Sequence, residues 1–178
     1  MTTFVRLLGI IAAHALVQSL LILGDPVPTF HWTFALTFAA SFCALVVALW
    51  AITAVMAANW DWRVLATVVG TVALAAAAGI LMPVLTVLVL TVGIALACCV
   101  ANRVQPLDFV RTNPVRTVIA FAGTAIGIVL LGIAAVGLGF LVTGAPGAFA
   151  TWIVAGLTYV SIVRVWTIRS AEAPIVRV

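Results

Sequence analysis

Apolar stretches of about twenty residues recur along this chain, and its eight arginines lie between these stretches, near their ends or in the C-terminal tail. A helix of about twenty apolar residues spans the ~30 Å hydrocarbon core of a bilayer. Hydrophobic residues make up 66% of the chain and charged residues only 7%, and the mean hydropathy is +1.39. Soluble domains carry about 25% charged residues. The composition therefore predicts an all-α membrane protein whose exterior is covered mostly by lipid.

The apolar stretches predict a polytopic bundle of about six transmembrane helices within a single domain. The expected spans are residues 4–23, 34–58, 64–81, 84–101, 118–142 and 149–168. The third and fourth come from one segment, residues 64–101, which carries no charge over 38 residues. As one helix this segment would be about 57 Å long, nearly twice the hydrocarbon thickness. We therefore expect two helices joined by a tight turn around Gly79 to Pro83, as a full hairpin or as a re-entrant pair.

The arginines predict how the chain is threaded through the membrane. The chain has no lysine, and its eight arginines are Arg6, Arg63, Arg103, Arg111, Arg116, Arg164, Arg169 and Arg177. A single crossing of residues 64–101 would place the later arginines on the opposite side from Arg6 and Arg63, against the positive-inside rule. We therefore expect both termini and the loop at residues 102–117 in the cytoplasm, with the bundle in the plasma membrane, as in the inner membrane of a bacterium.

Tryptophans and connecting segments agree with this topology. The outer connections, residues 24–33, 79–83 and 143–148, carry no positive charge. Tryptophan rings prefer the membrane boundaries, where one edge of the ring is wet. We expect Trp32 and Trp152 at the outer boundary and three others at the inner one: Trp60, Trp62 and Trp166. The basic pI of 9.8 then reflects the cytoplasmic arginines and suits anionic lipid headgroups, not nucleic acid.

Two polar residues within the first span form the candidate intramembrane site. His14 lies near the middle of that span, and Gln18 is one turn further on the same helix face. Burying these groups without hydrogen-bond partners is costly, so this face should look into the bundle or into a wet cavity. One interpretation is a substrate or proton site. The other is an interhelical hydrogen-bond cluster with Ser41 or with a threonine of another helix.

No motif in the chain points to catalysis, a metal or a cofactor. The cysteines lack any C-x-x-C or Cys/His spacing and are expected to be small apolar fillers: Cys43, Cys98 and Cys99. The acidic residues are far apart in sequence and lie at boundaries or in the tail: Asp25, Asp61, Asp108 and Glu172. A bis-histidine haem is excluded because His14 and His31 would lie about half a bilayer apart in depth. We expect a protein that is not an enzyme and has no cofactor.

The loop at residues 102–117 is the most distinctive exposed segment. Pro106 suits the first position of a helix, Asp108 suits the first turn, and Pro114 should end the segment. The pattern predicts a two-turn amphipathic helix at the cytoplasmic surface that includes Phe109 and Arg111. This helix is either a docking element for a cytoplasmic partner or a linker whose arginines contact lipid phosphate.

Small residues four apart predict close helix packing, and Gly123-x-x-x-Gly127 is the clearest pair. This pair is either a dimer face or a contact inside one bundle. For function, two hypotheses follow. The first is a small permease or the membrane subunit of a multi-component transporter. The second is a non-transporting assembly or regulatory subunit of a larger membrane complex. The partners implied are the lipid bilayer and, in either case, other membrane or cytoplasmic subunits.

Overall fold

The computed structural model of this chain describes residues 2–24 and 32–172. The helices are α1 (Thr2–Gly24), α2 (Trp32–Ala57), α3 (Trp62–Leu81), α4 (Pro83–Asn102), α5 (Pro106–Thr112), α6 (Pro114–Leu141) and α7 (Gly144–Glu172). Six of them are long and apolar enough to cross a membrane. The expected all-α membrane bundle of six long helices is thus confirmed. His31, Asp25 and Arg177 lie outside the described residues.

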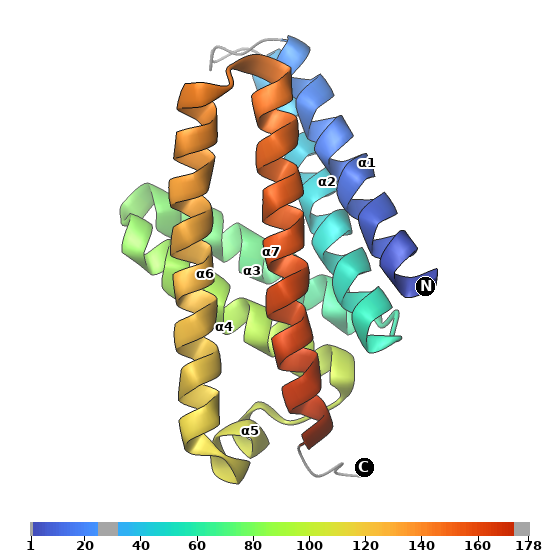
Figure 1. The fold of residues 1–178 in the computed structure, drawn as a ribbon, viewed down its shortest axis with the longest axis vertical. Helices are drawn as coiled ribbons and strands as arrows, with labels where there is room; N and C mark the ends of the chain where they lie inside the picture. Colours follow the sequence, from blue (N-terminus) through green and yellow to red (C-terminus); the bar gives the residue numbers. More distant parts are fainter. Residues whose placement is uncertain (1, 25–31, 173–178) are drawn as a thin grey trace.

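The long helices form two groups with different directions (Figure 1). Helices α1, α2, α6 and α7 run along the long axis of the molecule, and α7 packs against both α1 and α6. Helices α3 and α4 pack side by side as a hairpin that crosses these four obliquely. α7 also contacts α2 and α4, so this helix is the common neighbour on which the bundle is assembled.

Polar residues and prolines set the helix boundaries near one end of the molecule. Asp61 caps α3, because its carboxylate accepts a hydrogen bond from the backbone N–H of Arg63 at 2.9 Å. Asn113 caps α6 in the same way through the N–H of Arg116 at 3.2 Å. Pro114 then occupies the first turn of α6, where a missing N–H costs no hydrogen bond.

The turn between α3 and α4 is as short as the sequence predicts. Met82 alone separates the two helices, and its N–H donates to the carbonyl of Ala78 at 2.7 Å. The tip lies to one side of the molecule, about midway along the long axis, and not beside the α6–α7 connection (Figure 1). Its side chains are apolar and exposed, with Ile80 87% and Leu81 79% accessible. Such side chains are suited to hydrocarbon, and a re-entrant pair would place them there.

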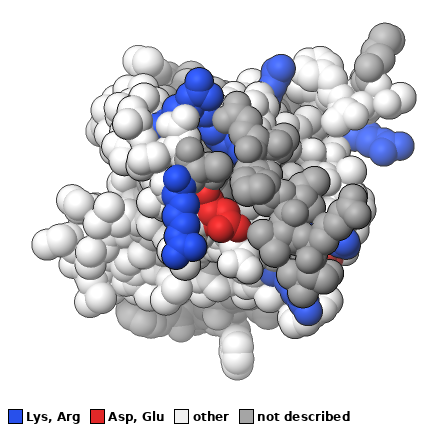
Figure 2. Space-filling view, turned by 90° about the horizontal axis from the view of Figure 1, so that it is seen from below, with Lys and Arg blue, Asp and Glu red and all other residues white. Residues whose placement is uncertain are grey.

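Arginines gather at one end of the molecule (Figure 2). The view is from below Figure 1, on the end that carries α5, and every blue atom is arginine because the chain has no lysine. Described acidic residues lie among them on the same face. The prediction that the arginines share one side thus agrees with the three-dimensional arrangement of the helices.

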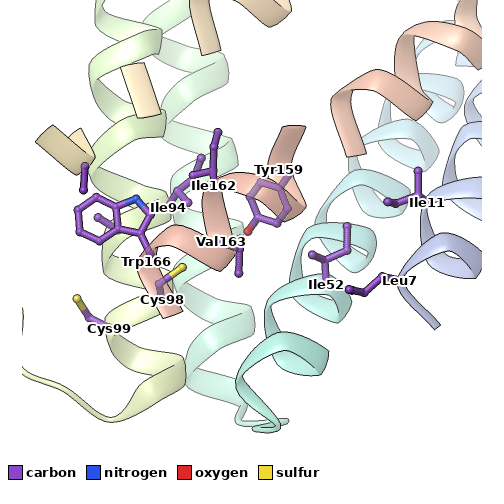
Figure 3. Close-up of a cluster of buried hydrophobic side chains, with 12 residues drawn as sticks. Leu7, Ile11, Ile52, Ile94, Cys98, Cys99, Tyr159, Ile162, Val163 and Trp166 are labelled. Atoms are coloured by element: carbon purple, nitrogen blue, oxygen red, sulfur yellow. The ribbon is translucent and has the colours of Figure 1, made fainter. Parts of the chain in front are cut away.

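Apolar side chains between α7 and its neighbours form the main core cluster (Figure 3). Val163 and Cys98 are fully buried, and Trp166 is 1% exposed. Val163 and Trp166 belong to α7. On one side of them lie the α4 residues Ile94, Cys98 and Cys99, and on the other side lie Leu7 and Ile11 of α1 and Ile52 of α2. The cysteines Cys98 and Cys99 are free and buried, in agreement with their expected role as apolar fillers, whereas Cys43 is exposed.

Trp166 corrects the interpretation of the tryptophans. It was expected at the inner membrane boundary, but it is the largest fully buried side chain of the described residues. Its indole N–H donates to the hydroxyl of Thr124 on α6 at 3.0 Å, and its ring meets Phe121 edge-on. This protein partner replaces the water that an interfacial indole would use. Trp60 and Trp62 are exposed, as residues at a boundary should be.

Two glycines other than the Gly123/Gly127 pair allow the closest helix contacts. A Cβ added at Gly156 would lie 2.7 Å from Cγ2 of Ile11, and one added at Gly93 would overlap the side chain of Thr71. A Cβ at Gly127 would meet Ile162 at an ordinary 3.6 Å, and Gly123 has nothing within 4 Å. Gly127 therefore makes a contact inside the bundle, which was one of the two alternatives for this pair, and the tightest contacts lie at Gly93 and Gly156.

Candidate functional site: a central apolar cavity

A cavity of about 390 Å³ lies among the long helices. This volume falls within the ~300–1,000 Å³ range of small-molecule sites. Each of the six long helices contributes to its wall, with α1 represented by Ile11 and His14 and α6 by Ile128 and Leu131. The remaining wall residues are mainly alanine, leucine, isoleucine and valine from α2, α3, α4 and α7. The cavity exists because the oblique hairpin and the four upright helices cannot stay in contact along their whole lengths.

His14 lies near the middle of α1, and it lines this cavity. Its ring meets the indole of Trp152 on α7 edge-on, with the centroids 5.0 Å apart and the planes at 80°. Nδ1 and Nε2 are both buried, and neither makes a hydrogen bond of good geometry with a described residue. The backbone of Ala44 is a polar group close enough to the imidazole ring to interact with it. His14 is therefore packed against an aromatic ring, with the backbone of Ala44 as a polar neighbour and no hydrogen bond of good geometry.

Gln18 has a different environment, although it lies one turn from His14. Its amide Nε2 donates to the carbonyl of Ser41 at 3.0 Å, and the Ser41 hydroxyl donates back to Oε1 at 2.7 Å. Gln18 is 4% exposed and does not line the cavity. The alternative of an interhelical hydrogen-bond cluster with Ser41 thus describes Gln18. His14 and Gln18 do not form the expected shared site. Gln18 is hydrogen-bonded to Ser41, whereas His14 lies against the cavity.

Most other polar groups of the wall already have partners. The Thr71 hydroxyl donates to the carbonyl of Thr67 at 2.8 Å, and the Thr86 hydroxyl donates to Ala75 at 3.4 Å. The Tyr159 and Thr53 hydroxyls are 2.8 Å apart and hydrogen-bonded. No arginine, aspartate or glutamate of the described residues lines the cavity. Its interior is therefore suited to neutral, largely apolar molecules, since an ion would enter without a counter-charge.

The α7 side of the site was not anticipated from the sequence. Trp152, Gly156 and Tyr159 lie three and four residues apart, so they share one helix face. This face combines two large aromatic rings with a glycine that brings α7 close to α1. The spacing is visible in the sequence, but Trp152 was interpreted as a boundary residue. Only its contact with His14 identifies it as part of the site.

The candidate docking loop forms the short helix predicted for it. Helix α5 begins at Pro106, with Asp108 in its first turn and Arg111 in its last turn. Pro106 and Arg111 are exposed, while the side chain of Phe109 is outside the described residues. Leu107 and Val110 are exposed as well. This exposed apolar surface at the arginine-rich end is the pattern of a helix lying among lipid headgroups. No residue of α5 is among those that line the cavity, and the helix lies at the lower end of the molecule (Figure 1).

Within residues 2–24 and 32–172, no three His, Cys, Asp or Glu side chains come close enough to hold a metal ion. Comparison of the chain with protein-family models, with curated proteins and with solved structures gave no match. The function must therefore be inferred from the geometry of the site.

Proposed function

We propose that this protein is a small membrane transporter, or the membrane subunit of a larger one, whose central cavity binds a lipophilic molecule. The observation that carries this proposal is the 390 Å³ apolar cavity, which has wall residues on all six long helices. The cavity opens to the surroundings of the bundle, so a molecule other than this chain must fill it if dispersion contacts are not to be lost there. A bound apolar molecule would restore them.

Access from the bilayer follows from the same geometry. The tip of the α3–α4 hairpin is apolar and exposed, and Ala76 and Thr86 near this tip line the cavity, so we expect lipid around the cavity at this level. A lipophilic ligand is concentrated in the membrane and can reach the cavity from there without crossing water. We place the arginine-rich end, with α5 among the headgroups, on the cytoplasmic side of a plasma membrane. The role is binding and transfer, not catalysis.

The test is to extract and identify lipophilic molecules that remain bound to the protein after purification in mild detergent. Ala155→Phe places a large ring in the cavity wall, and Ala122→Phe places the same ring on the exposed face of α6 as a matched control. We expect one compound to accompany the wild-type protein and Ala122→Phe in nearly equimolar amount and to be absent from Ala155→Phe. The identified compound is then added to vesicles containing the protein, and its passage between the leaflets is measured.

The same lipid profile in wild-type protein and Ala155→Phe would contradict the proposal, because the cavity would then hold nothing specific. If the compound binds but does not pass between the leaflets, the proposed binding function stands and the proposed transport function is wrong.

A second candidate, a non-transporting assembly or regulatory subunit, is favoured by the exposure of α6. Only three residues of this long helix are buried: Thr117, Ala120 and Thr124. A stoichiometric protein partner that is lost on Gly137→Trp and retained by Ala155→Phe would support this function. Gly137 has nothing within 4 Å of its Cβ position, so the change alters the outer face and leaves the bundle interior in place.

A further inference from the structure

The polar groups of the cavity wall that lack a hydrogen-bond partner limit the chemistry of the ligand. The hydroxyls of Thr71 and Thr86 donate to helix carbonyls, and Tyr159 is bonded to Thr53. The Thr158 hydroxyl can turn to a carbonyl of its own helix, as threonines in helices commonly do. His14 has no such local solution, because neither of its nitrogens has a hydrogen-bond partner of good geometry within the described chain.

The position of His14 makes this lack informative. A neutral imidazole has one donor and one acceptor, and a buried group of either kind is costly when unmatched. Leucine would fill the same place at no such cost, and the neighbouring Gln18 is fully satisfied by Ser41. A half-turn of the ring about its Cβ–Cγ bond exchanges its nitrogens with its carbons. A molecule in the cavity can therefore meet a ring nitrogen without any movement of the helices.

The charge of the ligand is limited by the rest of the wall. The described wall residues include no acid and no arginine, so an ionised ligand would face only dipoles. A neutral imidazole suits this wall, since no described acidic residue is present in it to pair with an imidazolium. The indole of Trp152 lies beside His14 and provides a flat apolar surface at the same place. Recognition at this corner is thus by one hydrogen bond and by aromatic contact.

We infer that His14 and Trp152 form the head-group pocket for a neutral lipophilic ligand that carries one hydrogen-bonding oxygen, a hydroxyl or a carbonyl. The apolar remainder of the ligand lies along the alanine and leucine wall between α2, α4 and α7. This inference rests on the proposed function, because it specifies what occupies the same cavity. A long-chain alcohol and a quinone share the required chemistry, and a hydrocarbon of the same length lacks it.

The experiment uses two photoreactive probes, a long-chain alcohol with a diazirine in its chain and the hydrocarbon of equal length with the same diazirine. Each is added to the full-length protein in lipid vesicles and photolysed, and labelled peptides are identified by mass spectrometry. We expect both probes to label the α1 and α7 segments of the cavity wall. Labelling by the alcohol should be about tenfold stronger, which is the factor expected from one hydrogen bond in an apolar site.

Variants assign the preference to His14. His14→Leu should label equally with both probes, because the hydrocarbon contacts remain and the hydrogen bond is lost. His14→Gln keeps a donor and an acceptor and should restore part of the preference. Gln18→Leu, which changes a residue outside the cavity, should leave the preference unchanged.

The outcomes separate this inference from the proposed function. Equal labelling by both probes in the wild-type protein would overturn the inference and leave an apolar binding cavity. A preference for the alcohol that persists in His14→Leu would overturn the role of His14. If neither probe labels the wall residues, both the inference and the proposed binding function are wrong.

Discussion

The core around Trp166 and the cavity beside His14 are built from the same helices, yet they are organised in opposite ways. Around Trp166 the side chains are closely packed, and the one polar hydrogen of the ring is held by Thr124. Beside His14 the packing opens into a cavity, and the ring nitrogens have no good partner. A membrane bundle that only needs to hold together would resemble the first region throughout. The second region is therefore the place to look for a ligand.

The largest expected effect is all-or-none and tests how these two regions are placed in the membrane. Single cysteines at Thr112, Ala145 and Met82 are introduced after Cys43, Cys98 and Cys99 have been replaced. In intact cells, an impermeant thiol reagent should label the cysteine at Ala145, because this residue follows the α6–α7 connection. The cysteine at Thr112 should label only after permeabilisation. The cysteine at Met82 should label in neither case, since a re-entrant pair holds the hairpin tip in hydrocarbon.

Labelling of the cysteine at Thr112 from outside would show that the topology is the reverse of the one proposed. Rapid labelling of the cysteine at Met82 would show that α3 and α4 form a full hairpin and not a re-entrant pair.

Trp166→Ala should give the largest loss of stability. Truncating a fully buried tryptophan lowers the free energy of unfolding by about 3–5 kcal/mol, because the packing contacts and the bond to Thr124 are both lost. Trp152→Ala is the matched control, since its ring lines a cavity and has fewer contacts to lose. The free energy of unfolding is measured by denaturant titration in detergent micelles. Similar losses for both variants would show that the two regions do not differ in packing.

Gly156→Ala should have an intermediate effect. The new methyl group would lie within 2.7 Å of Ile11, whose β-branched side chain is stiff in a helix. Overpacking of this kind costs about 1–3 kcal/mol, and in a double-mutant cycle the effects of Gly156→Ala and Ile11→Ala should not add, because both change the same contact. Gly123→Ala faces open space and should change the free energy of unfolding by less than about 0.5 kcal/mol. A larger effect at Gly123 would indicate that its face is covered by another subunit.

The smallest effect should distinguish the two polar residues of α1. Gln18→Leu removes both hydrogen bonds to Ser41, and we expect a loss of about 1–2 kcal/mol in the free energy of unfolding, the scale of hydrogen bonds in membranes. His14→Leu removes no hydrogen bond of good geometry and adds apolar contact, so stability should be unchanged or slightly higher. A loss at His14 equal to that at Gln18 would mean that its imidazole has a structural partner after all.

Sequence reasoning succeeded wherever one helix determines the answer. Apolar length alone indicates the six long helices, the turn at Met82 lies within the predicted range of Gly79 to Pro83, and α5 begins at the proline expected for it. The polarity of Gln18 and Ser41 was enough to suggest that they meet.

The failures concern how helices meet one another. Spacing shows which residues share a face, but it does not show what the face contacts, so Gly123 was preferred to Gly93 and Gly156. The oblique hairpin, the burial of Trp166 and the cavity beside His14 all depend on crossing angles between helices. Those angles are set by the summed packing of many small side chains, which no single motif records.

The most direct test of the binding cavity is electron cryo-microscopy of the protein in a lipid nanodisc, with a bound antibody fragment to provide size. We expect elongated density within the cavity that contacts His14 and Trp152, with the α3–α4 hairpin oblique as in Figure 1. A map in which the hairpin and α7 close against each other, with the cavity filled by protein side chains and no density between them, would contradict the binding role.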